Sequence, residues 1–223
     1  MLSGEAVVAI WNDITPGGRA DFYDWHLHEH MPERAGIPGF RRGRRYIAVD
    51  PSTQPEFFTL YEADTMGVLQ GSDYLARLNA PTPWTRRATA EFRNTSRALA
   101  RVLSSTGPGP GGIALTIRFD ARPEAAARLA ALCQAAAKAA RVTGGHLCAA
   151  DDAASAERTA ESAGRTDLQA PPTWFVMLEA TDAQALAALV TEAELRAAGA
   201  AGAIVRGLYR LEYTRTKTDC AAG

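Results

Sequence analysis

Two short stretches, one in each half of the chain, repeat the same apolar pattern. Residues 57–63 read FFTLYEA and residues 174–180 read WFVMLEA, and a pair of one threonine and one aspartate follows each of them. Threonine and aspartate are good helix N-caps, so both stretches predict a strand followed by a helix. A match of this kind within one chain of 223 residues indicates the internal duplication of a whole structural unit.

A segment rich in glycine and proline separates the two copies. Residues 106–112 read TGPGPGG, which is incompatible with regular structure and predicts a linker. The patterns on the two sides of this linker predict the same order of elements, which favours a strand at 91–104 despite its helical propensity. The predicted strands cover 6–14, 40–49, 56–63, 91–104, 113–119, 144–150, 173–180 and 203–215, and the helices cover 19–34, 64–78, 123–141 and 182–198.

Each half therefore predicts a β-α-β-β-α-β unit, which is the ferredoxin-like arrangement. We divide the chain into a first unit at 1–105, the linker at 106–112 and a second unit at 113–216. A polar segment rich in alanine and serine at 151–172 predicts an exposed insertion in the second unit. Residues 217–223 follow the last strand, and we expect them to be a disordered tail.

The third strand of each unit is apolar on both faces. In the first unit, alternation places Phe57, Thr59 and Tyr61 on one face and Phe58 and Leu60 on the other. Helices can cover only one face of such a sheet, so the second face needs another partner. We therefore predict an α+β fold in which the two antiparallel sheets pack as one barrel-like unit within a single chain.

The overall composition excludes several classes of partner. The formal net charge is −1 and no RNP-like aromatic motif occurs, so we expect no nucleic acid and no membrane surface as partner. The three cysteines are widely spaced and form no CxxC pair, which argues against a disulfide framework. The N-terminal stretch lacks the basic and apolar parts of a signal peptide, and no apolar run approaches the ~20 residues of a membrane span. We predict a cytoplasmic protein.

One stretch of the first half resembles a known family. Residues 25–34 read WHLHEHMPER, and PGF follows at 38–40 and RRY at 44–46. A tryptophan before Glu-His-x-Pro-Glu, then PGF, then RRY, is similar to the EthD-like group of dimeric α/β-barrel proteins, and the resemblance covers about residues 7–63. It implies the fold derived above. The wider superfamily includes ring-modifying monooxygenases, muconolactone-type isomerases, haem-degrading enzymes and dehydratases, so the resemblance implies no single reaction.

The histidines of this stretch are the candidate catalytic residues. His26 and His30 are four residues apart and share one face of the predicted helix, while His28 points elsewhere. Histidine is well suited to proton transfer near neutral pH, so we expect His30 to act as acid or base. Arg45 and Tyr61 would orient the substrate across the gap between helix and sheet. The alternative is a histidine that only stabilises the end of the helix through hydrogen bonds to the backbone.

The same gap would hold the substrate. We expect the substrate-binding residues to be Trp25, Phe40, Tyr46, Phe58 and Trp84. The tryptophan in the proline-rich loop, Trp84, would cover the pocket as a lid, or would simply anchor its loop. The second half has LCQAAA at 132–137 in place of the histidine cluster, so the site is expected in the first half only.

Four arginines lie in the first part of the second predicted strand. Alternation sends Arg42 and Arg44 to one face and Arg41 and Arg45 to the other. They could bind an anion or a carboxylate. They could also pair with acidic neighbours and protect a strand edge from aggregation.

The expected chemistry needs no cofactor and no metal. No GxGxxG, Walker or CxxCH motif occurs. The HxxxH spacing of His26 and His30 would suit a divalent metal, but Glu62 or the distant His146 would have to supply a third ligand.

The sequence leaves three functions open. The leading hypothesis is a cofactor-independent acid/base enzyme, of the isomerase, cyclase or monooxygenase type, acting on an aromatic, lactone or polyketide-like compound. The second is a non-catalytic ligand-binding or accessory protein of a catabolic pathway, and the third is a metal-dependent oxygenase. The expected partner is a small hydrophobic or aromatic molecule, and exposed strand edges leave room for a homodimer.

Overall fold

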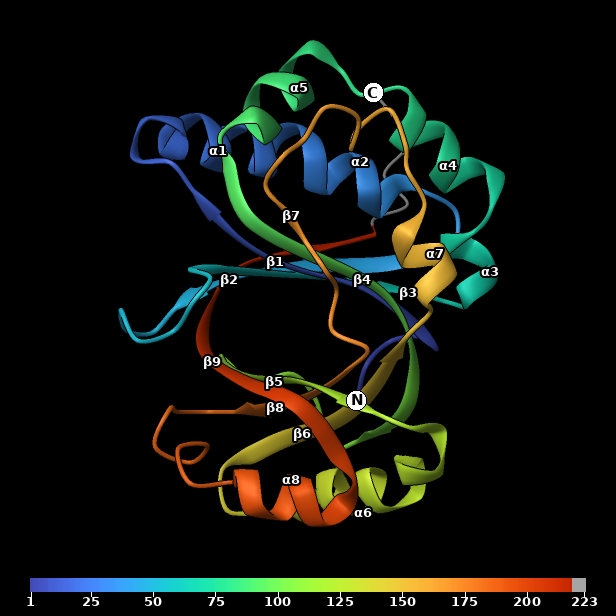
Figure 1. Ribbon diagram of the computed structural model, residues 1–223. Helices are drawn as coiled ribbons and strands as arrows, with labels where there is room; N and C mark the ends of the chain where they lie inside the picture. Colours follow the sequence, from blue (N-terminus) through green and yellow to red (C-terminus); the bar gives the residue numbers. More distant parts are fainter. Residues whose placement is uncertain (218–223) are drawn as a thin grey trace.

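The computed structural model describes residues 1–217 and shows a closed antiparallel barrel of eight strands with helices outside it (Figure 1). The prediction of an α+β barrel is confirmed. The barrel strands are β1 (Ala6–Ile14), β2 (Phe40–Ala48), β3 (Phe57–Ala63), β4 (Phe92–Thr106), β5 (Ile113–Ala121), β6 (Val142–Ala150), β8 (Trp174–Ala180) and β9 (Ala200–Thr216). Of the predicted tail at 217–223, only Lys217 lies within the described residues.

The two halves contribute four barrel strands each. In the first half β1 pairs with both β3 and β4, and β3 pairs with β2. In the second half β5 pairs with both β8 and β9, and β8 pairs with β6. The pairs β2–β9 and β4–β6 join the two sheets edge to edge and close the barrel. Closure leaves these eight strands without a free edge.

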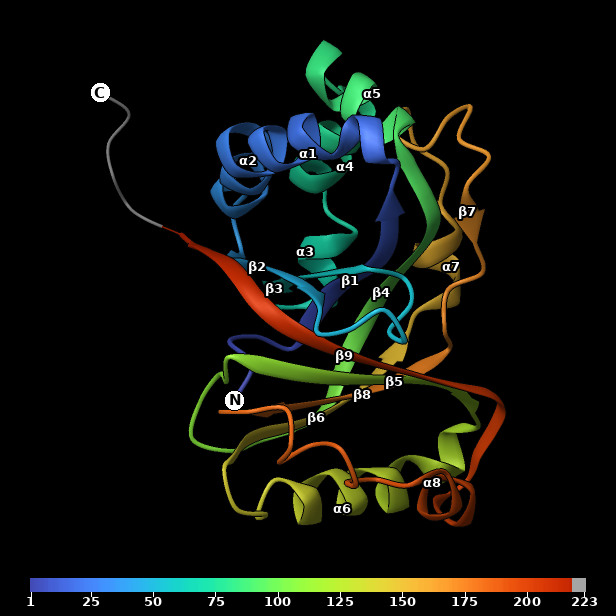
Figure 2. The same cartoon turned by 90° about the vertical axis from the view of Figure 1, so that its left-hand side faces the viewer.

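Helices cover the barrel on two opposite sides (Figure 2). The first half supplies α1 (Arg19–Trp25), α2 (Met31–Gly36), α3 (Met66–Leu69), α4 (Ser72–Asn79) and α5 (Pro83–Ala90), and the second half supplies α6 (Ala126–Ala136), α7 (Asp152–Ala156) and α8 (Glu192–Ala198). Short 3-10 turns η1 (Pro16–Gly18) and η3 (Pro123–Ala125) precede α1 and α6. Within residues 1–217, no helix is long and apolar enough to cross a membrane.

Several helices differ from their predicted extents. The helix predicted at 64–78 is divided into α3 and α4 around Gly71. The helix predicted at 182–198 begins only at Glu192, because Val190 adopts a positive φ of 54° and Thr191 starts a capping box. The proline-rich loop contains α5, because Thr82 caps it and Pro83 occupies a favourable first position.

The strand alternation predicted for β3 is confirmed. Phe58 and Leu60 lie inside the barrel in a cluster with Trp11, Tyr46 and Phe175. The other face of β3 points outward, where Tyr61 and Phe57 belong to two different clusters beneath the helices of the first half. The outer layer of the second half is instead occupied by one continuous apolar cluster.

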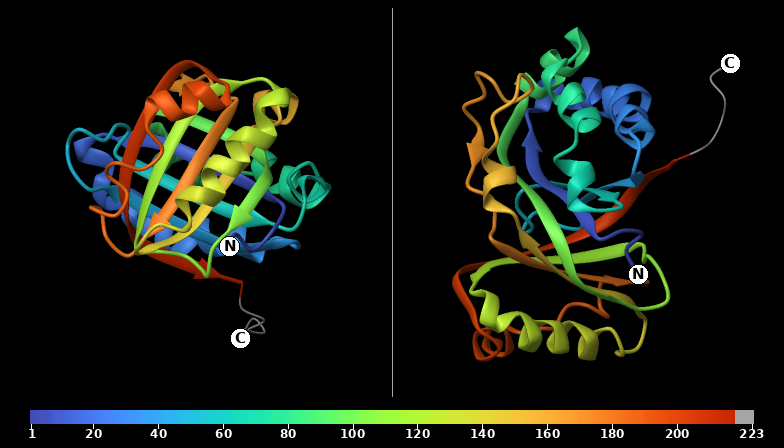
Figure 3. Two further views of the ribbon diagram at one scale, coloured as in Figure 1. Left: turned by 90° about the horizontal axis from the view of Figure 1, so that it is seen from below. Right: turned by 90° about the vertical axis from the view of Figure 1, so that its right-hand side faces the viewer.

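Residues 151–172, predicted as an exposed insertion of the second half, extend over the first half (Figure 3). We call them the covering segment. The backbone of Asp151 donates to Leu99 of β4, and that of Glu161 donates to Leu78 of α4. The short strand β7 (Leu168–Gln169) then pairs in parallel with β4 at Thr95 and Ser96. The covering segment therefore encloses the outer layer of the first half from the side.

Candidate functional site

A cavity of about 350 Å³ lies between the helices of the first half and the outward face of its sheet. This volume lies within the range of about 300–1,000 Å³ that is typical of small-molecule sites. Its apolar and aromatic wall is formed by Ile10, Phe22, Trp25, Tyr61, Tyr74, Leu78 and Phe92. Polar side chains of the first half also converge on it, namely Asn12, His26, His30, Arg34, Thr59 and Arg97. The covering segment supplies the remaining side.

A π-helical turn, η2 (His26–His30), carries the two histidines between α1 and α2. The backbone N–H of Met31 donates to the carbonyl of His26, which is the i→i+5 bond of a π-helix. The two imidazole rings lie 5.5 Å apart between centroids and are inclined by 27°. The indole of Trp25 lies 4.3 Å from the ring of His30. Single π-helical turns are frequent at functional sites, and this one brings three rings to one cavity.

Both histidines are buried and neutral at neutral pH. Only 3% of the surface of His26 and 5% of that of His30 is exposed to solvent. Desolvation lowers the pKa of His26 well below its usual value, and the positive charges of Arg45 and Arg34 lower it further. Desolvation, followed by the charges of Arg34 and His26, does the same to the pKa of His30. Each ring therefore keeps a lone pair that can accept a proton.

Tyr61 connects the histidine pair to the sheet. Its phenolic oxygen lies 3.2 Å from Nε2 of His26. Burial raises the pKa of Tyr61, so the phenol stays protonated. If Nε2 of His26 carries the hydrogen and donates to Tyr61, the phenolic O–H is free to donate to a ligand. Within residues 1–217, the Nδ1 atoms of His26 and His30 have no hydrogen-bond partner.

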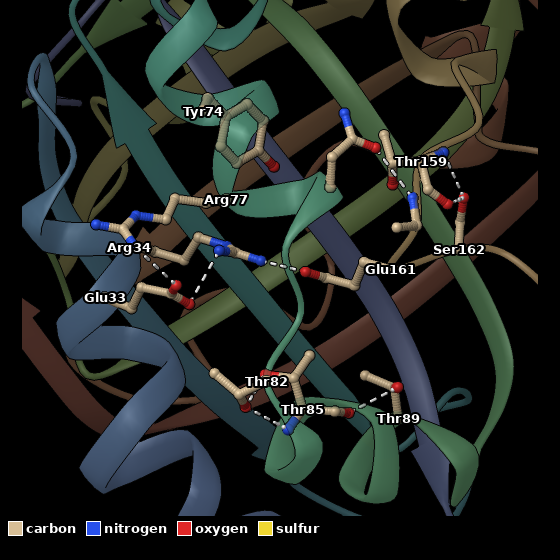
Figure 4. A network of polar contacts seen from close by, with 12 residues as sticks. Glu33, Arg34, Tyr74, Arg77, Thr82, Thr85, Thr89, Thr159, Glu161 and Ser162 are labelled. Atoms are coloured by element: carbon tan, nitrogen blue, oxygen red, sulfur yellow. Dashed lines mark hydrogen bonds and ion pairs between the residues drawn. The ribbon is translucent and has the colours of Figure 1, made fainter.

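The position of Trp25 depends on α5. Its indole N–H donates to the hydroxyl of Thr85 at 3.2 Å. The hydroxyls of Thr82 and Thr85 donate to Oε1 of Glu29 at 2.6 and 3.1 Å. Figure 4 shows Thr82 and Thr85 together at the start of α5. These contacts hold the indole beside His30, and nothing local in the sequence indicated them.

Arg34 joins the helix layer to the covering segment. Its guanidinium donates to Glu33 at 3.1 Å and forms an ion pair with Glu161 (Figure 4). The same guanidinium lies 5.8 Å from the centroid of the Tyr74 ring. Only 2% of Arg34 is exposed, so its charge needs these partners. A residue of the second half thus neutralises a buried charge in the cavity wall of the first half.

The structure brings four of the predicted site residues to the cavity: Trp25, His26, His30 and Tyr61. Arg45 is not among them. Its guanidinium lies 4.6 Å from the ring centroid of Tyr23 and donates to Glu212 at 3.2 Å. Arg45 therefore acts on His26 only through its charge, because Tyr23 and Glu212 hold it away from the cavity.

The other four predicted substrate contacts also lie elsewhere. Tyr46 and Phe58 pack together inside the barrel, with ring centroids 5.4 Å apart, because the inward face of each strand is sealed by the second sheet. Phe40 packs against Tyr74 behind the cavity wall. Trp84 donates its indole N–H to Asp21 at 2.9 Å, so it anchors α5 on α1 rather than covering the cavity.

The two residues considered as a third metal ligand, Glu62 and His146, belong to a separate network inside the barrel. Arg44 lies between Glu62, at 3.0 Å, and Glu179. His146 contacts Glu179 at 3.0 Å through Nε2 and Ser105 at 3.0 Å through Nδ1. Among residues 1–217, no group of three His, Cys, Asp or Glu side chains is placed to hold a metal ion. His26 and His30 therefore have no third ligand beside them in this part of the chain.

This network is buried, and both of its glutamates are paired with arginines, since Arg42 also contacts Glu62 at 2.7 Å. Burial alone would raise the pKa of Glu179, but the hydrogen bond from His146 and the charge of Arg44 lower it to about 2. Arg44 and Glu62 come from the first half, and His146 and Glu179 come from the second. The network thus ties the two sheets together at one end of the barrel.

The fold and the cavity together define an α+β-barrel protein with a cavity outside the barrel wall of one half. No family model and no curated protein matches the chain. The family-level resemblance to EthD-like proteins therefore remains an expectation.

Solved structures share the fold. An anthrone oxidase-like protein is 14% identical, with a TM-score of 0.62, covering 97% of this chain and 94% of that one. A proposed monooxygenase from Lactobacillus acidophilus is 9% identical, with a TM-score of 0.55 and coverage of 96% and 97%. A proposed monooxygenase from Fusobacterium nucleatum is 8% identical, with a TM-score of 0.54 and coverage of 97% and 96%. These structures share the α+β-barrel fold with this chain, and at these identities the likeness shows the fold alone.

Proposed function

We propose that the protein is a small-molecule enzyme of the monooxygenase type that oxygenates a planar aromatic or polyketide-like substrate without a cofactor. The observation that carries this proposal is the pair of buried, neutral imidazoles of His26 and His30 in the wall of an aromatic cavity. Likeness in fold to an anthrone oxidase-like protein and to two proposed monooxygenases favours oxygenation over isomerisation or cyclisation.

The chemistry begins with a proton transfer. His30 accepts a proton from a phenol or from an acidic C–H group of a ring stacked near Trp25. The low pKa of His30 reflects desolvation first, and an anionic substrate beside it would favour the imidazolium by charge pairing. Tyr61 donates its phenolic hydrogen to the oxygen atom on which the negative charge develops.

The resulting phenolate or carbanion is electron-rich enough to reduce O₂ directly. For a ring methylene group the balance is CH₂ + O₂ → C=O + H₂O. One oxygen atom becomes the new carbonyl and the other leaves as water, while both C–H bonds supply the electrons. Neither a flavin nor a metal is needed to balance this reaction.

The test uses anthrone as the substrate, with O₂ consumption and anthraquinone absorbance as readouts. We expect the wild-type protein to accelerate the conversion, and His30→Gln to lower the rate by about 100-fold or more. His28→Gln is the matched control, because His28 lies on the same turn but is exposed. Full activity of His30→Gln, or no acceleration of anthrone or related phenols by the wild-type protein, would contradict the proposal.

A ligand-binding or accessory role is the second candidate, because a cavity with aromatic walls suits binding as well as catalysis. It predicts that an aromatic ligand is recovered unchanged after prolonged incubation with O₂. It also predicts equal affinity for that ligand in the wild-type protein and in His30→Gln.

The finer features of the fold belong to the same proposal. We propose that the chain is a fused pair of ferredoxin-like repeats, with units at 1–105 and 113–216, related to EthD-like proteins and acting in the cytoplasm. The equal order of strands and main helices in the two halves supports the repeat. The substrate is the expected small-molecule partner of the first unit.

A further inference from the structure

Four arginines line the cavity, and their partners differ. Arg34 pairs with Glu33 and Glu161, and Arg165 pairs with Asp167 at 2.7 Å. Arg158 is exposed on the covering segment. Arg97 is partly buried, and no carboxylate among residues 1–217 forms an ion pair with it.

Arg97 faces the cavity from the barrel wall. It lies on β4 opposite Ile10 of β1, and both Ile10 and Thr95, two residues earlier on the same face of β4, line the cavity. Its Nη2 donates to the phenolic oxygen of Tyr74 at 3.0 Å. That hydrogen bond fixes the guanidinium in the wall but leaves its charge without a counter-ion in the described part of the chain.

The Tyr74 ring holds two guanidiniums in place. The guanidinium carbon of Arg97 lies 5.9 Å from the ring centroid, and that of Arg34 lies 5.8 Å from it. Both arginines are thus near one aromatic ring, but only Arg34 is neutralised by glutamates. Arg158 forms no ion pair among residues 1–217 either, but it is exposed to solvent. Arg97 is therefore the partly buried cation that an anion entering the cavity would meet.

We propose that Arg97 binds the carboxylate of the ligand, so that the substrate class is an aromatic carboxylic acid. A guanidinium has five N–H donors in a planar fork, and Tyr74 accepts from one of them, so a carboxylate can still bind through two parallel hydrogen bonds. A partly desolvated cation without a counter-ion is a favourable position for such a group. The aromatic part of the ligand rests on the function proposed above, whereas the acidic group rests on Arg97.

The experiment compares two probes of nearly equal shape, anthracene-2-carboxylate and anthracene-2-carboxamide, by titration calorimetry. We expect the wild-type protein to bind the acid about tenfold or more tightly than the amide. Arg97→Gln removes this preference, because it lowers the affinity for the acid by a much larger factor than the affinity for the amide. Arg97→Lys keeps the charge without the planar fork, so it retains part of the preference.

Arg101→Gln is the matched control, because Arg101 is an exposed residue on the same strand, 3.9 Å from Asp151. It should keep the full preference for the acid. Equal affinity of the wild-type protein for both probes, absence of binding at millimolar concentration, or an undiminished preference in a folded Arg97→Gln would overturn the proposal.

Different results would contradict the proposed enzyme function and the proposed carboxylate site at Arg97. Binding of the acid that depends on Arg97, without any oxygenation of anthrone, would support the acid site and contradict the enzyme. Oxygenation of neutral anthrone, without a preference for the acid over the amide, would support the enzyme and contradict the acid site.

Discussion

The Nε2 atom of His26 lies 3.2 Å from the phenolic oxygen of Tyr61, and this contact joins the π-helical turn to the third strand of the barrel. Both side chains are buried. The contact therefore sets the orientation of one imidazole in the cavity wall and uses one of the few polar atoms on the outward face of β3.

Replacement of Tyr61 by phenylalanine tests this contact. The variant leaves Nε2 of His26 buried without its partner, so we expect the free energy of unfolding to fall by about 1–3 kcal/mol. Urea denaturation measures the change. Tyr23→Phe is the control, because the Tyr23 hydroxyl is 3.4 Å from Glu212 and only partly buried, so its loss should cost less. Equal stability of Tyr61→Phe and the wild-type protein would show that the contact contributes nothing.

The two histidines predict a dependence of stability on pH. Their pKa values are depressed in the folded protein, so below about pH 6.5 the unfolded chain binds more protons than the folded one. Above that pH the two histidines do not reduce the free energy of unfolding. As the pH decreases toward the pKa values of the folded protein, this free energy falls by up to about 1.4 kcal/mol per pH unit for each histidine. Urea titrations at pH 7, 6 and 5 measure this slope.

A matched pair of variants shows which histidine causes the dependence of stability on pH. His30→Gln should remove about half of it, and His28→Gln, at an exposed position on the same turn, should leave it unchanged. A wild-type protein whose stability did not change between pH 7 and pH 5 would show that both imidazoles have ordinary pKa values.

The ion network inside the barrel predicts a large loss of stability on removal of one charge. Glu179→Gln leaves Arg44 buried with Glu62 as its remaining carboxylate partner, and we expect a loss of about 3–5 kcal/mol. Glu192→Gln is the control, because its pair with Arg196 is exposed and should contribute about 0.3–0.5 kcal/mol. Chemical denaturation distinguishes the two, and similar losses would contradict the structural role of the network.

The ion pair between Arg34 and Glu161 predicts how firmly the covering segment is held. Glu161→Gln weakens the pair, so the segment should open more often and trypsin should cleave after Arg158 or Arg165 several times faster. Glu157→Gln is the control, because Glu157 is an exposed residue of the same segment. Unchanged cleavage of Glu161→Gln would mean that the segment is held by its backbone hydrogen bonds to β4 and α4.

Much of the fold follows from local patterns. The alternation of FFTLYEA correctly separates Phe58 and Leu60 inside the barrel from Tyr61 outside it. The spacing of His26 and His30 correctly predicts that they share one face of their turn, and in the structure both line the cavity. These patterns work because the period of a strand or a helix is a property of consecutive residues and does not depend on the rest of the chain.

The composition of the site was decided by tertiary packing. Alternation along β2 separates Arg44 from Arg45, but only the barrel determines that Arg44 meets Glu179 inside and that Arg45 meets Tyr23 and Glu212 outside. Local patterns do not show that a segment after β6 would cover the first half, because the ion pair of Arg34 with Glu161 joins residues far apart in the chain. The sequence by itself therefore determined the elements and the faces of their side chains. Only the tertiary structure decided which outward face would be filled by apolar residues and which would enclose a cavity, because that depends on contacts between distant segments.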